Sequence, residues 1–182
     1  MEYFGKSGIV SRFEQLDNDL LSIVRDNNRV EITIAGGCAL VMLDLVGDTR
    51  VTTDIDVLEA EHQARVLFER YNMNEDVNTF LFRMPENWVE RRQRIPFEGI
   101  VLDIYAPSNE DLAIMKICAY RETDQKDVLE MLKEKKIDIR KLETIVSDDS
   151  ELRVNFDNED DWKDFLLRLN EIKTLAFAEG EQ

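Results

Sequence analysis

Asp54 and Asp56 stand one residue apart in a segment that the sequence predicts to be a strand over residues 51–59. Residues i and i+2 of a strand point to the same side, so both carboxylates project together while Ile55 points away from them. Two carboxylates at that spacing repel each other unless a cation lies between them, and oxygen ligands of this kind suit Mg²⁺ or Mn²⁺. The same spacing also fits two solvated aspartates on an exposed strand.

Gly36 and Gly37 follow a predicted strand over residues 30–34 and precede an apolar segment, residues 38–46, that reads as a short buried helix. Glycines let a backbone approach a ligand closely, and the start of a helix presents N–H groups to a phosphate. The alternative interpretation is a tight turn from strand to helix that binds no ligand.

Asp103 lies inside a nearly continuous apolar run, residues 99–105, which predicts a strand central in the sheet. A charge in a buried strand needs a partner. If the neighbouring strand carries Asp54 and Asp56, Asp103 completes a metal site of three carboxylates. Alternatively, Asp103 forms a structural ion pair or caps the next helix.

A helix expected over residues 109–121 carries Lys116, and Arg121 and Asp127 follow it. A lysine can meet a triphosphate as a point charge, and an arginine can bind it through two parallel hydrogen bonds. The alternative is a helix face whose charged side chains pair with one another.

The elements that would position these residues are mixed strands and helices followed by helices only. Ser108, with Asp111 three residues later, resembles a helix cap. We therefore expect an α+β core over residues 1–107 and a C-terminal helical region packed on it over residues 108–182. The expected helices are 8–27, 38–46, 61–71, 109–121, 124–135, 138–147 and 159–175, with a loop at 147–151, and the expected strands are 30–34, 51–59, 77–84 and 99–105.

The composition limits the class of partner. The chain of 182 residues has 23 Lys and Arg against 39 Asp and Glu, a net charge of −16, which disfavours non-specific binding to nucleic acid. We expect a cytoplasmic protein with no membrane association, because the chain shows no leader peptide and no apolar stretch that would span a bilayer. Cys38 and Cys118 lie in apolar segments and are expected to be buried free thiols.

Two runs together resemble the signature of the nucleotidyltransferase superfamily: Ile34-Ala35-Gly36-Gly37-Cys38-Ala39-Leu40 and Arg50-Val51-Thr52-Thr53-Asp54-Ile55-Asp56-Val57. Their particular form is similar to that of the AbiEii-like toxins. The segment from Asp111 to Asp127 resembles the helix pair of that family, which carries Lys-x-x-Ala-x-Arg-x-x-Asp-x-x-Asp. The resemblance covers residues 30–132.

This resemblance implies a polymerase beta-like nucleotidyltransferase fold: a mixed sheet with flanking helices and a C-terminal helical extension. It implies that Asp54, Asp56 and Asp103 hold Mg²⁺ or Mn²⁺, and that Asp103 activates the attacking hydroxyl. Lys116 would be catalytic and would contact the phosphates. The nucleoside triphosphate would be bound by Gly36, Gly37, Arg50, Thr52, Arg121 and Asp127.

The activity that follows from the resemblance is transfer of a nucleotidyl group from a nucleoside triphosphate to a hydroxyl of RNA or protein. It also implies the toxin of a toxin–antitoxin pair, with an antitoxin protein as partner. An RNA acceptor would have only the cluster Arg91, Arg92 and Arg94 to meet it. The alternative from another class is a catalytically silent module that binds a nucleotide or a protein. A glycosyltransferase would require more chain before Asp54 than is present.

Overall fold

The structure is a computed structural model, and it describes residues 3–24, 28–77, 83–148 and 150–178. These residues form two compact units. The first comprises residues 1–79 and 92–107, and the second comprises residues 80–91 and 108–182. Within the described ranges, every helix is too short or too polar to serve as a membrane span.

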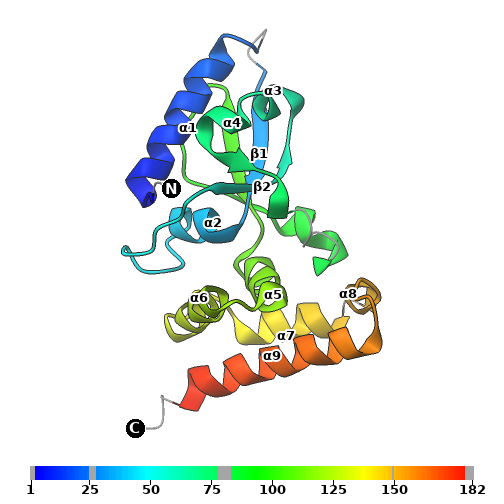
Figure 1. Cartoon of the computed structure of the whole chain (residues 1–182). Coiled ribbons are helices and arrows are strands. Elements are labelled where there is room, and N and C mark those ends of the chain that lie inside the picture. The colour runs from blue at the N-terminus through cyan, green and yellow to red at the C-terminus, as the bar shows by residue number, and fades with distance from the viewer. Residues whose placement is uncertain (1–2, 25–27, 78–82, 149, 179–182) are drawn as a thin grey trace. The chain divides into compact units, whose positions relative to one another are not determined.

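The first unit is built on a five-stranded sheet in the order β3-β2-β1-β5-β4. Antiparallel pairs join β1 to β2 and β4 to β5, whereas β1–β5 and β2–β3 are parallel, so the sheet is mixed (Figure 1). The α+β organisation expected from the sequence is confirmed. The strands are β1 (Val30–Ile34), β2 (Ile55–Ala60), β3 (Met73–Asn74), β4 (Gln93–Arg94) and β5 (Leu102–Ala106).

The longest helix of this unit, α1 (Lys6–Leu21), packs its apolar stripe into the core. It contacts α2 (Gly36–Met42) and β5. Asp17 of α1 fixes the entry to β5, because its carboxylate accepts hydrogen bonds from the backbone N–H groups of Ile100, Val101 and Leu102 at 2.7 to 2.9 Å. The helix expected over residues 8–27 is α1, Lys6–Leu21, which begins and ends earlier than the apolar pattern indicated.

Two other expectations for the first unit need correction, and a third falls largely outside the described residues. The single helix expected over residues 61–71 is two short helices, α3 (His62–Arg65) and α4 (Phe68–Tyr71). Strand β2 begins at Ile55, so Asp54 lies in the bend before it. The strand expected over residues 77–84 falls largely on residues 78–82, which lie outside the described residues, and β3 lies earlier in the chain.

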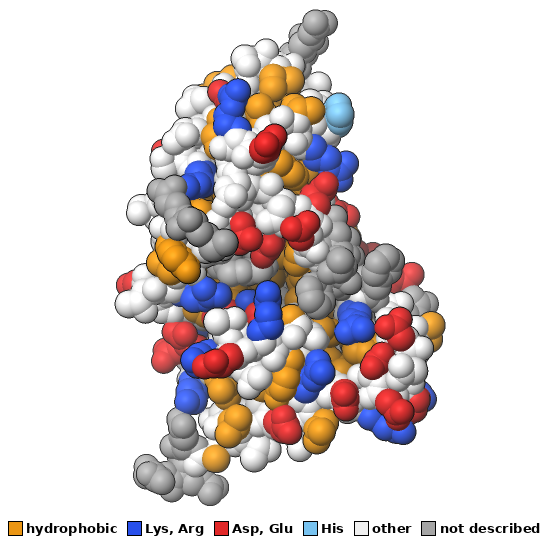
Figure 2. Space-filling view, in the orientation of Figure 1, with side chains coloured by type: hydrophobic (Ala, Val, Ile, Leu, Met, Phe, Trp, Pro, Cys, Tyr) orange, Lys and Arg blue, Asp and Glu red, His pale blue; other side chains and the backbone are white. Residues whose placement is uncertain are grey.

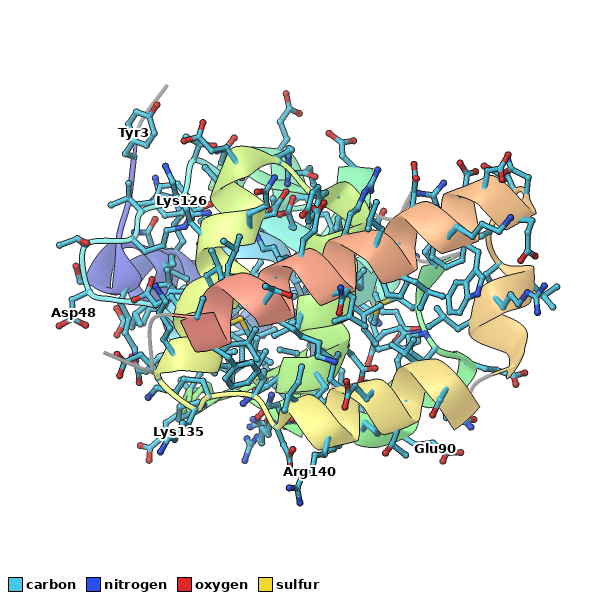
Figure 3. All side chains as sticks on the ribbon, turned by 90° about the horizontal axis from the view of Figure 1, so that it is seen from below. Tyr3, Asp48, Glu90, Lys126, Lys135 and Arg140 are labelled. Atoms are coloured by element: carbon cyan, nitrogen blue, oxygen red, sulfur yellow. The ribbon has the colours of Figure 1, made fainter. Side chains whose placement is uncertain are left out.

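Within the residues that the structure describes, the second unit contains the 3-10 helix η2 (Glu86–Arg91) and five α-helices. Helix α9 (Glu159–Ala178) runs across α5 and α6 and contacts both (Figure 3). The Ser108 cap is confirmed, since its hydroxyl accepts from the N–H of Asp111 at 3.1 Å. The other helices are α5 (Asn109–Ala119), α6 (Glu122–Lys133), α7 (Ile139–Asp148) and α8 (Ser150–Val154). The expected loop at 147–151 is thus largely helical.

Candidate active site

Gly36 brings the end of β1 against the carboxylate of Asp56. Its φ of +60° lies in the left-handed region, which only glycine adopts at little cost. A Cβ at this position would lie 1.9 Å from Asp56 Oδ2, so a side chain here would displace the carboxylate. The backbone is joined at the same point, because the N–H of Ala35 donates to the carbonyl of Asp56 at 2.9 Å.

Gly37 makes the next close approach, at the first turn of α2. A Cβ there would lie 3.3 Å from Arg50 Nη2 and 3.5 Å from Thr52 Oγ1. The hydroxyl of Thr52 donates to the carbonyl of Asp54 at 3.0 Å, which shapes the bend that leads into β2. The guanidinium of Arg50 and the start of α2 therefore share one side of the bend that carries Asp54.

Three polar groups lie near the carboxylate of Asp54, all at a long distance, and the single proton of the Thr52 hydroxyl is directed to the carbonyl of the same residue. The hydroxyls of Thr52 and Thr53 lie 3.5 Å from Oδ1, and the side-chain amide of Asn74 lies 3.5 Å from Oδ2. Such long contacts orient a carboxylate but leave lone pairs that a cation can take.

Both carboxylates influence the pKa of the Cys38 thiol. Burial raises the pKa of the Cys38 thiol well above its usual value, and the negative charges of Asp56 and Asp54 raise it further. Both cysteines are buried free thiols, as expected. Six predicted site residues are therefore brought together in the first unit: Gly36, Gly37, Arg50, Thr52, Asp54 and Asp56.

Asp103 does not join this group. On parallel strands β5 and β1 it lies opposite Glu31, four residues before Ala35, which pairs with Asp56. Four residues of strand span roughly 13 Å. Among the described residues, no three His, Cys, Asp or Glu side chains are grouped so that they could hold a metal ion. The structure therefore separates Asp103 from Asp54 and Asp56, which corrects the expectation of a metal site made of these three carboxylates.

Asp103 instead forms the structural ion pairs that the sequence left open as an alternative. Arg29 donates to it through Nε at 2.7 Å, and Arg94 pairs with it as well. The hydrogen bonds from Arg29 lower the pKa of Asp103, and those from Arg94 add to this effect. This acid therefore joins β5 to β4 and to the chain that enters β1.

Lys116, Asp124 and Asp127 form a buried ion cluster in the second unit. Lys116 Nζ lies 2.7 Å from Asp124 Oδ1 and 2.9 Å from Asp127 Oδ2, and all three residues are at most 6% exposed. Arg121 donates to Asp124 through Nε at 2.7 Å. Burial acts to raise the pKa of Asp124, but hydrogen bonds and charge from Arg121 and Lys116 outweigh it and the pKa is lowered.

The three arginines considered for an acceptor are each paired with an acid. Arg91 binds Asp111 in the second unit. Arg92 donates to Glu31 at 2.8 Å and stacks 4.4 Å from the centre of the Tyr105 ring. Arg94 pairs with Asp103, so an acid offsets the positive charge of each of the three arginines.

Asn72 and Asn74 are site residues that the sequence reasoning missed. Asn72 has a φ of +55°, which ends α4 and turns the chain into β3, and its side-chain amide donates to the carbonyl of Thr53. An asparagine after a predicted helix is a signal for such a left-handed end. Nothing in the pattern around Asn74 distinguishes it, because its role depends on the pairing of β3 with β2.

A comparison with known families gives one match. The model of the family described as "Nucleotidyltransferase of unknown function (DUF6036)" matches residues 11–176, which is nearly the whole chain. No curated protein and no solved structure matches the chain. The matched range includes every residue of the group around Asp54 and Asp56 and the whole Lys116 cluster.

Proposed function

The chain belongs to the DUF6036 family of nucleotidyltransferases of unknown function, and from this membership and the paired carboxylates we propose a metal-dependent enzyme. It transfers a nucleotidyl group from a nucleoside triphosphate to an acceptor hydroxyl. The acceptor oxygen forms a bond to the α-phosphorus while the bond from that phosphorus to the oxygen of the β-phosphate breaks, so pyrophosphate leaves and the hydroxyl proton passes to solvent. The observation that supports this most directly is the approach of the Asp56 carboxylate to Gly36 at the start of α2, with Asp54 two residues before it in the chain.

The donor set fits a hard divalent cation. Both carboxylates are partly exposed, they act on the same thiol, and the hydrogen bonds to Asp54 are long. Mg²⁺ is commonly held by one or two carboxylates together with substrate phosphates, so two aspartates suffice here without Asp103. When bound, the ion would polarise the phosphoryl oxygens and stabilise the charge that develops on them.

Each residue of the group around Asp54 and Asp56 has a role in this proposal. Asp54 and Asp56 would hold Mg²⁺ or Mn²⁺. Gly36 and Gly37 leave the backbone open to phosphate oxygens, and Arg50 places a positive charge beside Gly37. Thr52 shapes the bend that carries Asp54, because its hydroxyl donates to the carbonyl of Asp54.

Lys116, Arg121 and Asp127 enter this proposal through the motif resemblance, which assigns them to the phosphates of the nucleotide. In the structure the ammonium of Lys116 is paired with Asp124 and Asp127, so contact with a phosphate requires it to leave this ion cluster. The resemblance likewise supports a polymerase beta-like core, since β1, the glycines, α2 and β2 follow one another in the expected order.

Label transfer tests the enzymatic proposal. The protein is incubated with each labelled nucleoside triphosphate, Mg²⁺ and either total RNA or cell extract, beside an Asp54→Asn, Asp56→Asn double variant. We expect transfer by the wild type and a loss of at least 100-fold in the double variant, in line with other residues that stabilise developing charge. Transfer that is equal in both would exclude these carboxylates from the reaction.

A matched control is available on the same unit. Asp44 and Asp48 are exposed, so an Asp44→Asn, Asp48→Asn double variant makes the same change of charge at a different place (Figure 3 labels Asp48). It should transfer label as the wild type does. If the wild type binds a nucleoside triphosphate but transfers no label to any acceptor, the chain is instead a silent nucleotide-binding module.

A narrower proposal, that the enzyme is the toxin of a toxin–antitoxin pair, is supported by the likeness of its motifs to AbiEii-like toxins. Expression in a bacterial host should arrest growth, and the Asp54→Asn, Asp56→Asn double variant should not. Growth arrest that persists in the double variant would mean that the effect does not come from nucleotidyl transfer. An antitoxin protein is then sought by its ability to restore growth.

A further inference from the structure

Asn74 lies beside the paired carboxylates on the strand that borders β2. In the parallel pairing of β2 with β3, Asn74 stands opposite Asp56, and Met73 stands opposite Ile55. Its side-chain nitrogen lies 3.5 Å from Asp54 Oδ2. Asn74 therefore lies against both members of the pair. Its backbone stands opposite that of Asp56, and its side chain reaches the carboxylate of Asp54.

The amide of Asn74 has a fixed direction. Its oxygen accepts a hydrogen bond from the backbone N–H of Asp76 at 2.9 Å. Because that oxygen is held by a donor, the nitrogen is the end that faces Asp54, and a nitrogen of this type only donates. The opposite orientation would place a carbonyl oxygen against a carboxylate and would leave the Asp76 N–H without this acceptor.

The strand that carries Asn74 is itself anchored. Asn72 donates through its side chain to the carbonyl of Thr53, and its own carbonyl accepts from the N–H of Ile55 at 3.0 Å. The preceding Tyr71 is 6% exposed and donates through its hydroxyl to Asp19 of α1 at 2.7 Å. Asn74 is thus presented by a short segment that is tied to the bend before β2 and to α1.

We propose that Asn74 is a positioning residue that holds the carboxylate of Asp54 in the orientation that binds a divalent cation. With Asn74 on Oδ2 and the hydroxyls of Thr52 and Thr53 near Oδ1, the plane of the carboxylate is defined from both sides. Groups that orient a metal ligand in this way typically affect metal affinity 10- to 100-fold. The inference rests on the proposed cation site at Asp54 and Asp56.

Binding of Mn²⁺ alone tests it, with no nucleotide or acceptor present. The affinity is measured by electron paramagnetic resonance of the free ion for the wild type, Asn74→Ala and Asn18→Ala. Asn18 is exposed on α1, where its amide donates to the carbonyl of Glu14, so it provides the same chemical change at a distant place. We expect roughly 10-fold weaker Mn²⁺ binding in Asn74→Ala and no change in Asn18→Ala.

A second comparison separates positioning from a structural role. Asn74→Ala is combined with Asp54→Asn and, separately, with Asp56→Asn, and the Mn²⁺ affinities are compared as two double-mutant cycles. If Asn74 acts through Asp54, its substitution changes affinity less than twofold in the Asp54→Asn background and about tenfold in the Asp56→Asn background. Equal losses in both backgrounds would mean a general structural effect and would overturn the proposal.

The outcomes also separate this inference from the proposed function. If the wild type binds Mn²⁺ and Asn74→Ala binds it equally well, the positioning role is overturned and the cation site stands. If the wild type binds no Mn²⁺ at millimolar concentrations, the cation site and the role of Asn74 fail together. The melting temperature of each metal-free variant is measured beside its affinity, and a large drop for Asn74→Ala alone would count against a positioning role.

Discussion

Gly36 is the residue on which the geometry of the carboxylate pair depends most. Its φ is positive, and the Asp56 carboxylate lies where a Cβ of residue 36 would be, so there is no space for a side chain. A glycine required only by a tight turn would have a positive φ but would not have to lie against Asp56. Here both requirements meet at one position, which links the turn after β1 to the side chain that would bind the cation.

We therefore expect Gly36→Ala to destabilise the protein by about 1–3 kcal/mol, because alanine must adopt a left-handed conformation and displace Asp56. Chemical denaturation measures the stability, and Mn²⁺ titration should show weaker binding. Gly5→Ala is the matched control, since a Cβ at Gly5 would meet nothing within 4 Å. Equal stability of the two variants would show that the contact with Asp56 is not retained in solution.

At the scale of the elements, Asp103 joins strands rather than binding substrate. Its side chain is 13% exposed and receives hydrogen bonds from Arg29 before β1 and Arg94 on β4. The sequence placed the acid in β5 correctly, but the register of β5 against β1 sets it near the wrong end of the sheet for the carboxylate pair.

Asp103→Asn should therefore weaken folding by about 1–3 kcal/mol at pH 7, because it removes charge-assisted hydrogen bonds, and should leave Mn²⁺ affinity unchanged. The pKa of Asp103 is lowered in the folded state. Its contribution is thus present above the unfolded pKa of about 3.9 and is lost as the pH falls through the lower, folded value. The stability difference from the wild type, followed by denaturation from pH 7 to pH 3, should shrink below about pH 4. A Mn²⁺ affinity that falls tenfold would restore Asp103 as a ligand.

Lys116 of α5 joins this helix to α6, because its ammonium pairs with Asp124 and Asp127. Removing one partner of a buried ion cluster leaves the remaining charges without compensation, which costs about 3–5 kcal/mol. We expect Lys116→Met to lose stability of that order in thermal or chemical unfolding, because Asp124 and Asp127 stay behind.

Lys126→Met is the control for this substitution. Lys126 lies on the exposed side of α6 and pairs with Glu122 one turn away, a kind of pair that contributes about 0.3–0.5 kcal/mol (Figure 3). Its loss should scarcely change the unfolding free energy. If Lys116→Met were as stable as Lys126→Met, the ammonium of Lys116 would be available to a ligand rather than committed to the cluster.

At the scale of the whole molecule, the net charge of −16 is the dominant property. Figure 2 shows acidic and basic side chains interspersed over the visible face, so on that face the acidic side chains are spread among basic ones. A spread excess of one sign destabilises a folded chain through self-repulsion, which salt screens.

We expect the melting temperature to rise between about 0.02 M and 0.3 M NaCl, where the screening length falls to below about 10 Å. KCl should act equally, because screening does not depend on the identity of the cation. A melting temperature that falls with salt would mean that the surface ion pairs contribute more than the repulsion among the excess acids. Differential scanning calorimetry at fixed pH provides the measurement.

The sequence by itself determined the features that depend on neighbouring residues. Apolar spacing predicted α1, β1 and β5 and, in the second unit, α5, α6, α7 and α9, although boundaries shifted by several residues. It did not predict η2 or α8. The sequence also predicted the glycines after β1, the cap at Ser108 and the two buried thiols, because each follows from local backbone geometry or local apolarity. The polar residue Thr33 is buried at 1% exposure because β1 is the middle strand of the sheet.

Only the tertiary structure decided which charged groups meet. The register of β5 on β1 placed Asp103 with two arginines, and the pairing of β3 with β2 placed Asn74 beside Asp54. Both depend on strands far apart in the chain, and a shift of a few residues along a strand moves a side chain by roughly 3.3 Å per residue. Local pattern therefore identified Asp54 and Asp56 as a pair, whereas their partners were set by long-range pairing that no local pattern encodes.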